Sequence, residues 1–546
     1  MVDIPALPAQ PVWDFSLADA DHIIVYDYEL PDGEVQVADG RVVAAPVAGI
    51  IAVPEGDGPH PLVIAIHGAH PGGVRERRYA GFDYLVQQLA AEGFAAISIN
   101  MTLNYTFVFG EPAEGEKWAR AIFDYHLAAL AQANAGDDPG FGLDLTGRID
   151  LERIHLIGHS RGGEVVNNLA WRDADTGEGR IRSLLHVAPT VVQNFTTADD
   201  PDFNPNHDPL ARPFPDLPTA IILPEFDGDV PNEGQRIFDE ILAAGVNESF
   251  AIVVFLSGAN HNFFNRAFLV DDRYGALSFA DPDNPRGWLD REQQEDFLLS
   301  YAVAFLAVVT GEREVKTTFA SVPQPTTMGW AAATVSTYLP GHTPLIAEPS
   351  PEVALTAYGP ARVAFARQGF PRDPNVLFNH PGVLFRPSRS LPLYSITWDD
   401  AGAAAAVPLT PGDLTGHLAI SLYLALDSAD ERNPWRPSPP PVCITSVPCS
   451  PPPVVMVVTL IDETGEMASV AVNEDAPALY HRPGHIEVFE GFDESITEWL
   501  GWTPLGELRI PLDLFDGVDL ATVTAMQLTF PSSSGAIMLS AIYAVG

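Results

Sequence analysis

Positive charge is scarce in this chain of 546 residues, which has a formal net charge of −43 and only two lysines, Lys117 and Lys316. A surface this acidic excludes a general nucleic-acid binder, because phosphate backbones require a basic surface. It also argues against binding to anionic membranes. An excess of carboxylates keeps a protein soluble in salt, so we expect salt tolerance, with an ordinary acidic secreted protein as the alternative.

Long apolar runs and cysteines are also rare. No run approaches the roughly 18 apolar residues that a spanning helix needs, so we expect no membrane insertion. Cys443 and Cys449 lie in a proline-rich run without a nearby histidine, which excludes a structural zinc site there. They fit either a short disulfide loop in an oxidising compartment or two free thiols. Residues 1–5 lack the features of a signal peptide, but a mature secreted chain would look the same, and we expect a secreted protein.

Two patterns divide the chain. Over residues 1–310, short apolar runs alternate with segments of helical spacing, which predicts an α/β domain whose mostly parallel sheet has helices on both faces. Residues 311–340 lose this periodicity and are predicted to form a linker. Residues 341–546 contain short strands separated by turn residues, which predicts an all-β sandwich.

The run Gly158-His159-Ser160-Arg161-Gly162 matches the pattern G-x-S-x-G. The pattern alone is weak evidence, since a chain of this length contains it by chance with odds of roughly one in six. Here it follows an apolar strand and opens a helical segment, as a nucleophile elbow requires. So tight a turn leaves no room for side chains at positions 158 and 162. Ser160 is therefore the candidate nucleophile.

A serine hydroxyl needs a base to take its proton, and in this arrangement the chain order is Ser, acid, His. His261 follows the last predicted strand of the α/β region and is the candidate base. Asp227 follows the strand before it and is the candidate acid, with Asp229 and Glu225 as competitors. Because an unperturbed histidine loses its proton near pH 6–7, activity is predicted to rise through that range.

The negative oxygen of a tetrahedral intermediate needs two backbone N–H donors. One is predicted to be the N–H of Arg161, directly after the nucleophile. The other is predicted to be the N–H of Ala69, in the glycine-containing segment 67–73 after the third strand.

Segments 67–73, 158–164 and 258–261, with the Asp227 loop, resemble the α/β-hydrolase superfamily. The form Gly-His-Ser-Arg-Gly-Gly is similar to the branch that contains dienelactone-hydrolase-like esterases, chlorophyllases, platelet-activating-factor acetylhydrolases and cutinase-like polyester hydrolases. The resemblance covers about residues 20–310 and implies esterase chemistry without a required cofactor. Long segments at 100–116 and 191–218 depart from the cutinase-like pattern and leave the substrate open.

The C-terminal region resembles the jelly-roll, galactose-binding-like modules of many secreted hydrolases. Such a module either binds carbohydrate or polymer or packs only against the catalytic domain. Four tryptophans are candidates for a binding platform, with packing as the alternative: Trp398, Trp435, Trp499 and Trp502.

One acidic segment places oxygen side chains at every second position, as a structural calcium site could, although a solvated loop is the favoured interpretation. Its residues are Asp200, Asp202, Asn204, Asn206 and Asp208. The leading functional hypothesis is a carboxylic-ester hydrolase that works through an acyl-enzyme intermediate. Polyesters and acylated polysaccharides are candidate substrates. The alternatives are a serine peptidase or amidase, and a non-catalytic binding protein, against which the complete triad argues. No oligomeric state is predicted.

Overall fold

The structure is a computed structural model that describes most of the chain. The described residues are 4–7, 12–13, 16–36, 40–69, 73–105, 112–191, 214–227, 229–230, 233–245, 247–272, 289–322, 327–328, 334–342, 345–347, 349–350, 355–367, 392–427, 430, 432–433, 454–473, 476–479 and 505–546.

A nine-stranded sheet forms the N-terminal part, with the strand order β11-β9-β8-β7-β6-β4-β5-β3-β2. The strands from β9 to β5 are parallel to one another, whereas β2, β3 and β11 each join an antiparallel neighbour. The bounds are β2 (Tyr26–Gln36), β3 (Val42–Ala52), β4 (His60–Ile66), β5 (Ala95–Ile99), β6 (Ile149–His159), β7 (Ile181–Val187), β8 (Thr219–Phe226), β9 (Ala251–Asn260) and β11 (Thr334–Leu339).

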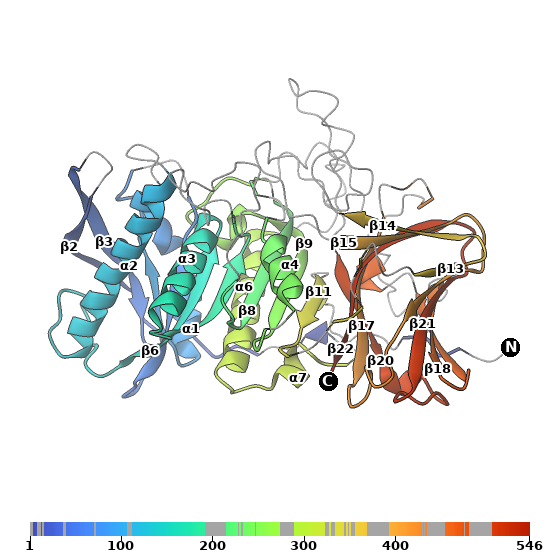
Figure 1. The fold of residues 1–546 in the computed structure, drawn as a ribbon. Helices are drawn as coiled ribbons and strands as arrows, with labels where there is room; N and C mark the ends of the chain where they lie inside the picture. Colours follow the sequence, from blue (N-terminus) through green and yellow to red (C-terminus); the bar gives the residue numbers. More distant parts are fainter. Residues whose placement is uncertain are drawn as a thin grey trace, which may run out of the picture.

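Helices cover both faces of this sheet. α2, α3 and α4 lie on one face, and α1 and α6 lie on the other (Figure 1). The helical elements are η1 (Arg78–Phe82), α1 (Asp83–Ala91), η2 (Thr102–Tyr105), α2 (Pro112–Asn134), α3 (Arg161–Thr176), α4 (Gln235–Ala244), η3 (Asn262–Phe264), α6 (Arg291–Val309) and α7 (Val315–Thr318). This mostly parallel sheet between two helical layers confirms the predicted α/β class and fits the α/β-hydrolase fold.

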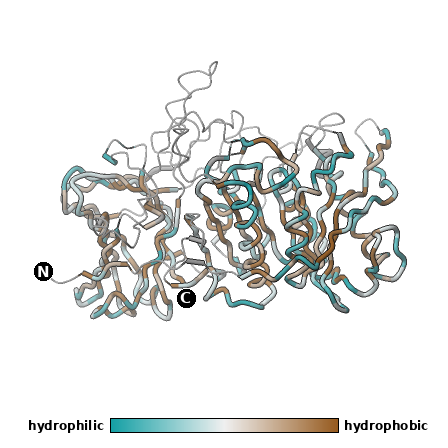
Figure 2. The backbone as a smooth tube through the Cα atoms, turned by 180° about the vertical axis from the view of Figure 1, so that it is seen from behind, coloured by the Kyte–Doolittle hydropathy of each residue, from teal (hydrophilic) through white to brown (hydrophobic). Residues whose placement is uncertain are grey.

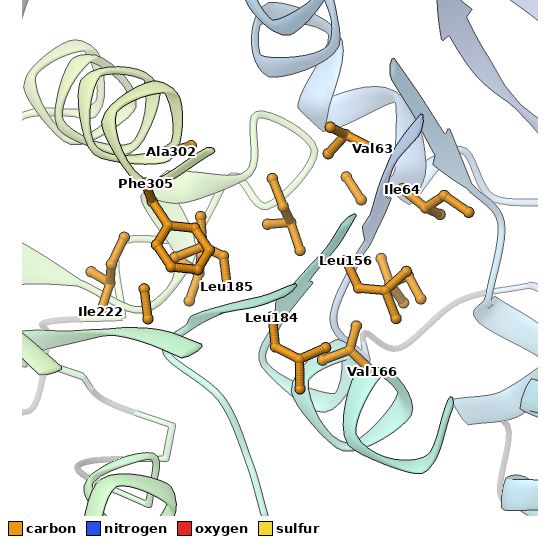
Figure 3. Packing of buried hydrophobic residues seen from close by; sticks show 14 of the residues in the cluster. Val63, Ile64, Leu156, Val166, Leu184, Leu185, Ile222, Ala302 and Phe305 are labelled. Atoms are coloured by element: carbon orange, nitrogen blue, oxygen red, sulfur yellow. The ribbon is translucent and has the colours of Figure 1, made fainter. Parts of the chain in front are cut away.

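The strands of the sheet are apolar on both faces because helices bury both. Successive side chains of a strand point to opposite faces. In β7, Leu184 lies toward Val166 of α3, and Leu185 lies toward Phe305 of α6 (Figure 3). These side chains are at most 1 % exposed, so the core continues on both sides of the sheet. The strands in the middle of the α/β part are mostly hydrophobic, and hydrophilic residues lie on the turns and helices around them (Figure 2).

The C-terminal β-unit, residues 345–546, consists of two antiparallel sheets. The six-stranded sheet contains β12 (Leu345–Ala347), β14 (Ala361–Arg367), β15 (Pro392–Trp398), β17 (Ala419–Leu426), β20 (Gly506–Pro511) and β22 (Gly535–Val545). The five-stranded sheet contains β13 (Thr356–Tyr358), β16 (Ala403–Pro408), β18 (Val454–Asp462), β19 (Met467–Asn473) and β21 (Val523–Phe530). The described residues of this unit also include two short helices, η4 (Pro477–Leu479) and η5 (Leu512–Leu514).

The six-stranded sheet is buried on both faces. In β17, Ile420, Leu422 and Leu424 belong to the core between the two sheets of the β-unit. Their neighbours Tyr423 and Ala425 point the other way and belong to the core of the nine-stranded sheet. The six-stranded sheet therefore lies between the five-stranded sheet and the α/β part, as Figure 1 shows.

The segment predicted as a linker, 311–340, contains regular structure. It holds α7 and β10 (Thr327–Met328), and β11 extends the main sheet by pairing antiparallel with β9. Part of this range therefore belongs to the α/β sheet. The N-terminal segment also joins the two parts, since β1 (Val12–Trp13) pairs with β10 and the backbone of residues 5–7 hydrogen-bonds to Ala471 of β19.

Candidate active site

Ser160 occupies a sharp turn between β6 and α3. Its φ of 54° and ψ of −126° lie outside the regions that residues with a side chain prefer. The turn is held on both sides, because Ser160 N–H donates to Val187 O at 3.0 Å and Ser160 O accepts from Gly163 N–H at 2.8 Å. A strained residue fixed at the carboxyl end of a central strand is the geometry of a nucleophile elbow.

The two glycines of the pattern are required by close backbone approach. A Cβ on Gly158 would lie 2.5 Å from Gly162 O, as the sequence predicts for this turn. A Cβ on Gly162 would instead meet Ile66 O of the neighbouring strand at 2.3 Å. The second glycine therefore serves the packing of α3 against β4 rather than the turn itself.

His261 lies beside the elbow and is bound by the predicted acid. Its Nδ1–H donates to Asp227 Oδ2 at 3.0 Å, and both side chains are 1 % exposed. The other oxygen of Asp227 accepts the N–H groups of Asp229 and Val230 at 2.9 and 2.7 Å. Asp227 is thus fixed by its own loop and leaves one oxygen for the imidazole.

The two competing acids have different surroundings. Glu225 accepts the N–H of Gly258 at 2.9 Å and so fixes the end of β9. Asp229 lies on the opposite side of the imidazole, with its Oδ2 at 3.7 Å from His261 Nε2, and its side chain is 64 % exposed. Only Asp227 faces Nδ1, which is where the orienting acid of a triad must be.

Two residues that sequence reasoning gave no role also hold His261. The Nε2–H of buried His159 donates to His261 O at 2.9 Å, and the two rings lie 4.9 Å apart. Asp272 accepts the N–H groups of His261 and Asn262 at 3.2 and 3.1 Å. The place of His159 within the elbow pattern could have suggested its contact, whereas no pattern in the sequence marks Asp272.

The charge state of His261 depends on the carboxylates around it. Burial of the ring lowers its pKa, but three charges outweigh burial and raise the pKa to about 9: those of Asp227, Asp229 and Asp272. Burial, together with the charge of His261, lowers the pKa of the adjacent His159 well below the usual value, so His159 is neutral.

We predict an alkaline pH profile for any reaction in which His261 acts as the base. Only the neutral ring accepts a proton, so kcat/KM should rise about tenfold per pH unit at low pH and level off above the His261 pKa of about 9. The sequence alone predicts the ordinary range of pH 6–7, and the three carboxylates around His261 move the rise upward. A kcat/KM profile for a neutral ester measures the midpoint, and a midpoint near 6.5 would contradict the role of these carboxylates.

The segment after β4 lies directly against the nucleophile. A Cβ on Gly68 would lie 2.6 Å from Ser160 Cβ, so only glycine allows this approach. The segment is fixed at His67, whose carbonyl accepts from Tyr105 Oη at 2.6 Å and whose Nε2 accepts the N–H of Met101 at 3.0 Å. Burial lowers the pKa of His67 to about 4, which keeps its ring neutral. Ala69, half-buried, follows at the same edge of the sheet.

Arg161, the first residue of α3, has its guanidinium over the Tyr105 ring, 5.5 Å from the centroid. Its Nε lies 3.6 Å from Glu164 Oε2, so the two side chains form an internal ion pair. Glu164 also accepts from the hydroxyl of Thr190. These contacts connect the start of α3 with the Tyr105 side chain that supports the segment after β4.

Several predicted residues lie outside the described part of the chain: Cys443, Cys449, Trp435, Trp499, Trp502, Asp200, Asp202, Asn204, Asn206 and Asp208. Trp398 is described; it is 4 % exposed and stacks on Phe530 at 3.9 Å, so it serves packing rather than a binding platform. Within the described residues, no group of three or more His, Cys, Asp or Glu side chains is arranged to hold a metal ion. No helix in the described ranges is long and apolar enough to cross a membrane.

Comparisons with known proteins give weak likenesses. No protein-family model matches the chain, and no curated protein matches its sequence. An esterase from Pyrobaculum calidifontis is 16 % identical over 55 % of this chain and 87 % of its own, with a TM-score of 0.32. A thermostable carboxylesterase from a metagenomic library is 18 % identical over 51 % and 92 % of the two chains, with a TM-score of 0.30. A putative dienelactone hydrolase from Klebsiella pneumoniae is 17 % identical over 52 % and 99 %, with a TM-score of 0.29.

Proposed function

We propose that the chain is a carboxylic-ester hydrolase in which Ser160 is the nucleophile, His261 the general base and Asp227 the acid that orients the base. The observation that carries the proposal is the 3.0 Å contact between His261 Nδ1 and Asp227 Oδ2 beside a serine held in an elbow. An acid, an imidazole and a strained serine brought together from three separate loops form the geometry of acyl transfer.

In the first half of the proposed reaction, Ser160 Oγ forms a bond to the ester carbonyl carbon while His261 Nε2 takes the hydroxyl proton. The carbonyl oxygen becomes negative and is bound by the N–H groups of Arg161 and Ala69. When the intermediate collapses, the bond to the alcohol oxygen breaks, and Nε2–H returns the proton to that oxygen. The alcohol leaves and the acyl group stays on Ser160.

In the second half, water replaces the alcohol. His261 Nε2 takes a proton from the water as its oxygen bonds to the acyl carbon, and the same N–H groups bind the oxyanion. The bond to Ser160 Oγ then breaks, Oγ regains the proton, and the carboxylic acid leaves. The cycle needs only side chains, backbone N–H groups and water, so no cofactor is part of the proposal.

The direct test is turnover of a series of p-nitrophenyl esters of increasing acyl length, together with labelling by a serine-directed phosphonate. We expect ester turnover and a single labelled residue, Ser160. Turnover of matched anilides at a comparable rate would favour the amidase alternative, and absence of both turnover and labelling would favour a binding protein. Polyesters and acylated polysaccharides belong in the same screen, because the resemblance to cutinase-like enzymes suggests polymeric substrates.

We predict that Asp227→Asn lowers kcat/KM about 10⁴-fold, by analogy with other triads. The asparagine oxygen can still accept the N–H groups of Asp229 and Val230, but its NH₂ group would face His261 Nδ1 and cannot accept the hydrogen bond that Nδ1–H donates.

The matched control is Asp229→Asn, which removes the same charge on the other side of the imidazole and should keep most of the activity when assayed above pH 9. The measurement is kcat/KM of both variants with the same p-nitrophenyl ester, and the variant with the larger loss identifies the acid of the triad. If Asp229→Asn is the more damaging change, the acid is misassigned.

A further inference from the structure

We propose that Asp229 makes the enzyme prefer esters whose alcohol part carries a positive charge; this inference rests on the proposed ester hydrolysis. Its starting point is the place of Asp229 relative to the reacting atoms. The Oδ2 atom of Asp229 lies 3.7 Å from His261 Nε2, the nitrogen that must exchange protons with the substrate.

The direction of proton transfer places the alcohol part of the substrate near this carboxylate. For Nε2–H to protonate the departing oxygen, that oxygen must come within about 3 Å of Nε2. Asp229 Oδ2 and the departing oxygen are then both neighbours of the same nitrogen, so groups two or three bonds beyond that oxygen can reach Asp229. In the proposed reaction the carbonyl oxygen is bound by the N–H groups of Ala69 and Arg161, so the acyl part takes the remaining position on the reacting carbon.

Asp229 differs from the other two carboxylates that act on His261 in being open to solvent. Asp227 is buried and bonded to Nδ1, and Asp272 is buried and accepts two backbone N–H groups. The Asp229 side chain is 64 % exposed and can meet a ligand. Arg161, the residue after the nucleophile, is paired with Glu164 beside Tyr105 and is 12 % exposed, so it does not cancel this charge at the surface.

The local charge acts within the broader negative field of a chain with net charge −43. That field extends over many ångströms, and salt screens it beyond about 8 Å at 0.15 M. A carboxylate a few ångströms from the substrate is screened much less. A preference for cationic over neutral esters that persists at 0.5 M salt is therefore due to Asp229 and not to the charge of the whole surface.

The test compares three esters that share one acyl group and differ in the alcohol: choline, its uncharged isostere 3,3-dimethylbutanol, and 3-hydroxypropanesulfonate. The measured quantity is the ratio of kcat/KM values for two esters within one protein at one pH. Because both esters meet the same His261, the ionisation of the base cancels from the ratio. We expect the choline ester to exceed its isostere by about tenfold and the sulfonate ester to fall below it by a similar factor.

Asp229→Asn should bring these ratios close to one. The matched control is Glu55→Gln, which removes one exposed carboxylate after β3, at the edge of the sheet where the parallel strands begin and thus opposite the active site. Its ratios should equal those of the parent protein. Melting curves of both variants check that each is folded.

Two outcomes would overturn the inference alone: a ratio near one in the parent protein, or an unchanged ratio in Asp229→Asn. Failure of all three esters, with no phosphonate labelling of Ser160, would overturn the proposed hydrolase and this inference together. Turnover of the neutral ester distinguishes the two kinds of failure.

Discussion

Ser160→Ala is expected to reduce ester hydrolysis by about 10⁴-fold or more and to leave the protein folded. The substitution removes one oxygen atom from a side chain that is 2 % exposed. The bonds that hold the turn, to Val187 O and from Gly163 N–H, are made by the backbone and do not depend on the hydroxyl. Alanine also keeps the Cβ against which Gly68 packs.

The matched control for this substitution is Ser98→Ala, which removes the hydroxyl of a fully buried serine on β5 in the same sheet. Its kcat/KM should equal that of the parent protein, and both variants should melt within a few degrees of it. Turnover of p-nitrophenyl esters and phosphonate labelling are the measurements. Substantial residual turnover in Ser160→Ala, or labelling of that variant, would show that another group is the nucleophile.

The elements of the site were predictable because they lie at fixed places in the chain. Ser160 follows the central strand, and Asp227 and His261 follow the next strands in the order that this arrangement requires. The sequence favours Asp227 but leaves Glu225 and Asp229 as competitors, since the three acids are spaced two residues apart at the end of β8 and just after it. Side-chain direction supports Asp227, because Asp227 faces Nδ1, Asp229 faces Nε2, and Glu225 binds a backbone N–H.

The same limit explains the shift of the His261 pKa to about 9. An unperturbed value near 6.5 is all that a sequence can supply. Asp272 reaches His261 through the folding of a segment that has no pattern of its own, and the exposed Asp229 returns toward the ring through the turn at Asp227. The hydrophobic periodicity of a sequence does not predict which charged side chains the loops bring together.

β11 and β16 are two strands of the fold that the sequence does not predict. The sequence predicts a linker where β11 lies, because residues 311–340 lose the alternation of strand and helix patterns, and nothing local shows that β11 pairs with β9. β16, with the sequence AAAAVP, has the composition of a helix, yet it pairs with β13 and β21. In β16 the contacts with other strands outweigh the local preference of alanine for helix, whereas in β11 the local preference already favours a strand.

The interface between the β-unit and the α/β part combines apolar and polar contacts. Tyr423 of β17 packs on Phe238 of α4, with ring centroids 5.6 Å apart, and its hydroxyl accepts from Gln235. The hydroxyl of Tyr543 donates to Tyr338 O of β11 at 3.0 Å. Tyr423 and Tyr543 are fully buried, and burying each such side chain contributes about 1.5–3 kcal/mol.

A buried ion pair lies at this interface. Glu507 and Arg509 of β20 are bonded to each other at 2.6 Å, and both side chains are 0 % exposed. Arg509 donates to the carbonyls of Phe319 and Ser321, and Glu507 accepts the N–H of Tyr338 at 2.9 Å. Leaving such groups without partners costs several kcal/mol, which is a large share of the stability of a typical domain.

We therefore predict that a chain ending at Gly311 is insoluble or melts far below the full-length protein, although it retains Ser160, Asp227 and His261. Its loss of β11 exposes the hydrogen-bonding edge of β9, and its loss of the β-unit exposes the apolar surface of α4 around Phe238.

A second chain, ending at Gly341, separates these two causes. It keeps β11, so the edge of β9 stays paired, but Tyr338 and the carbonyls of Phe319 and Ser321 lose the partners that β20 and β22 supply. We expect both shortened chains to aggregate, measured by size-exclusion chromatography and light scattering. If only the chain ending at Gly341 is soluble and active, the aggregation of the shorter chain is caused by the loss of β11. A sharp melting transition and full activity in the chain ending at Gly311 would instead make the β-unit an independent module, because an interface that stabilises the fold cannot be removed without cost.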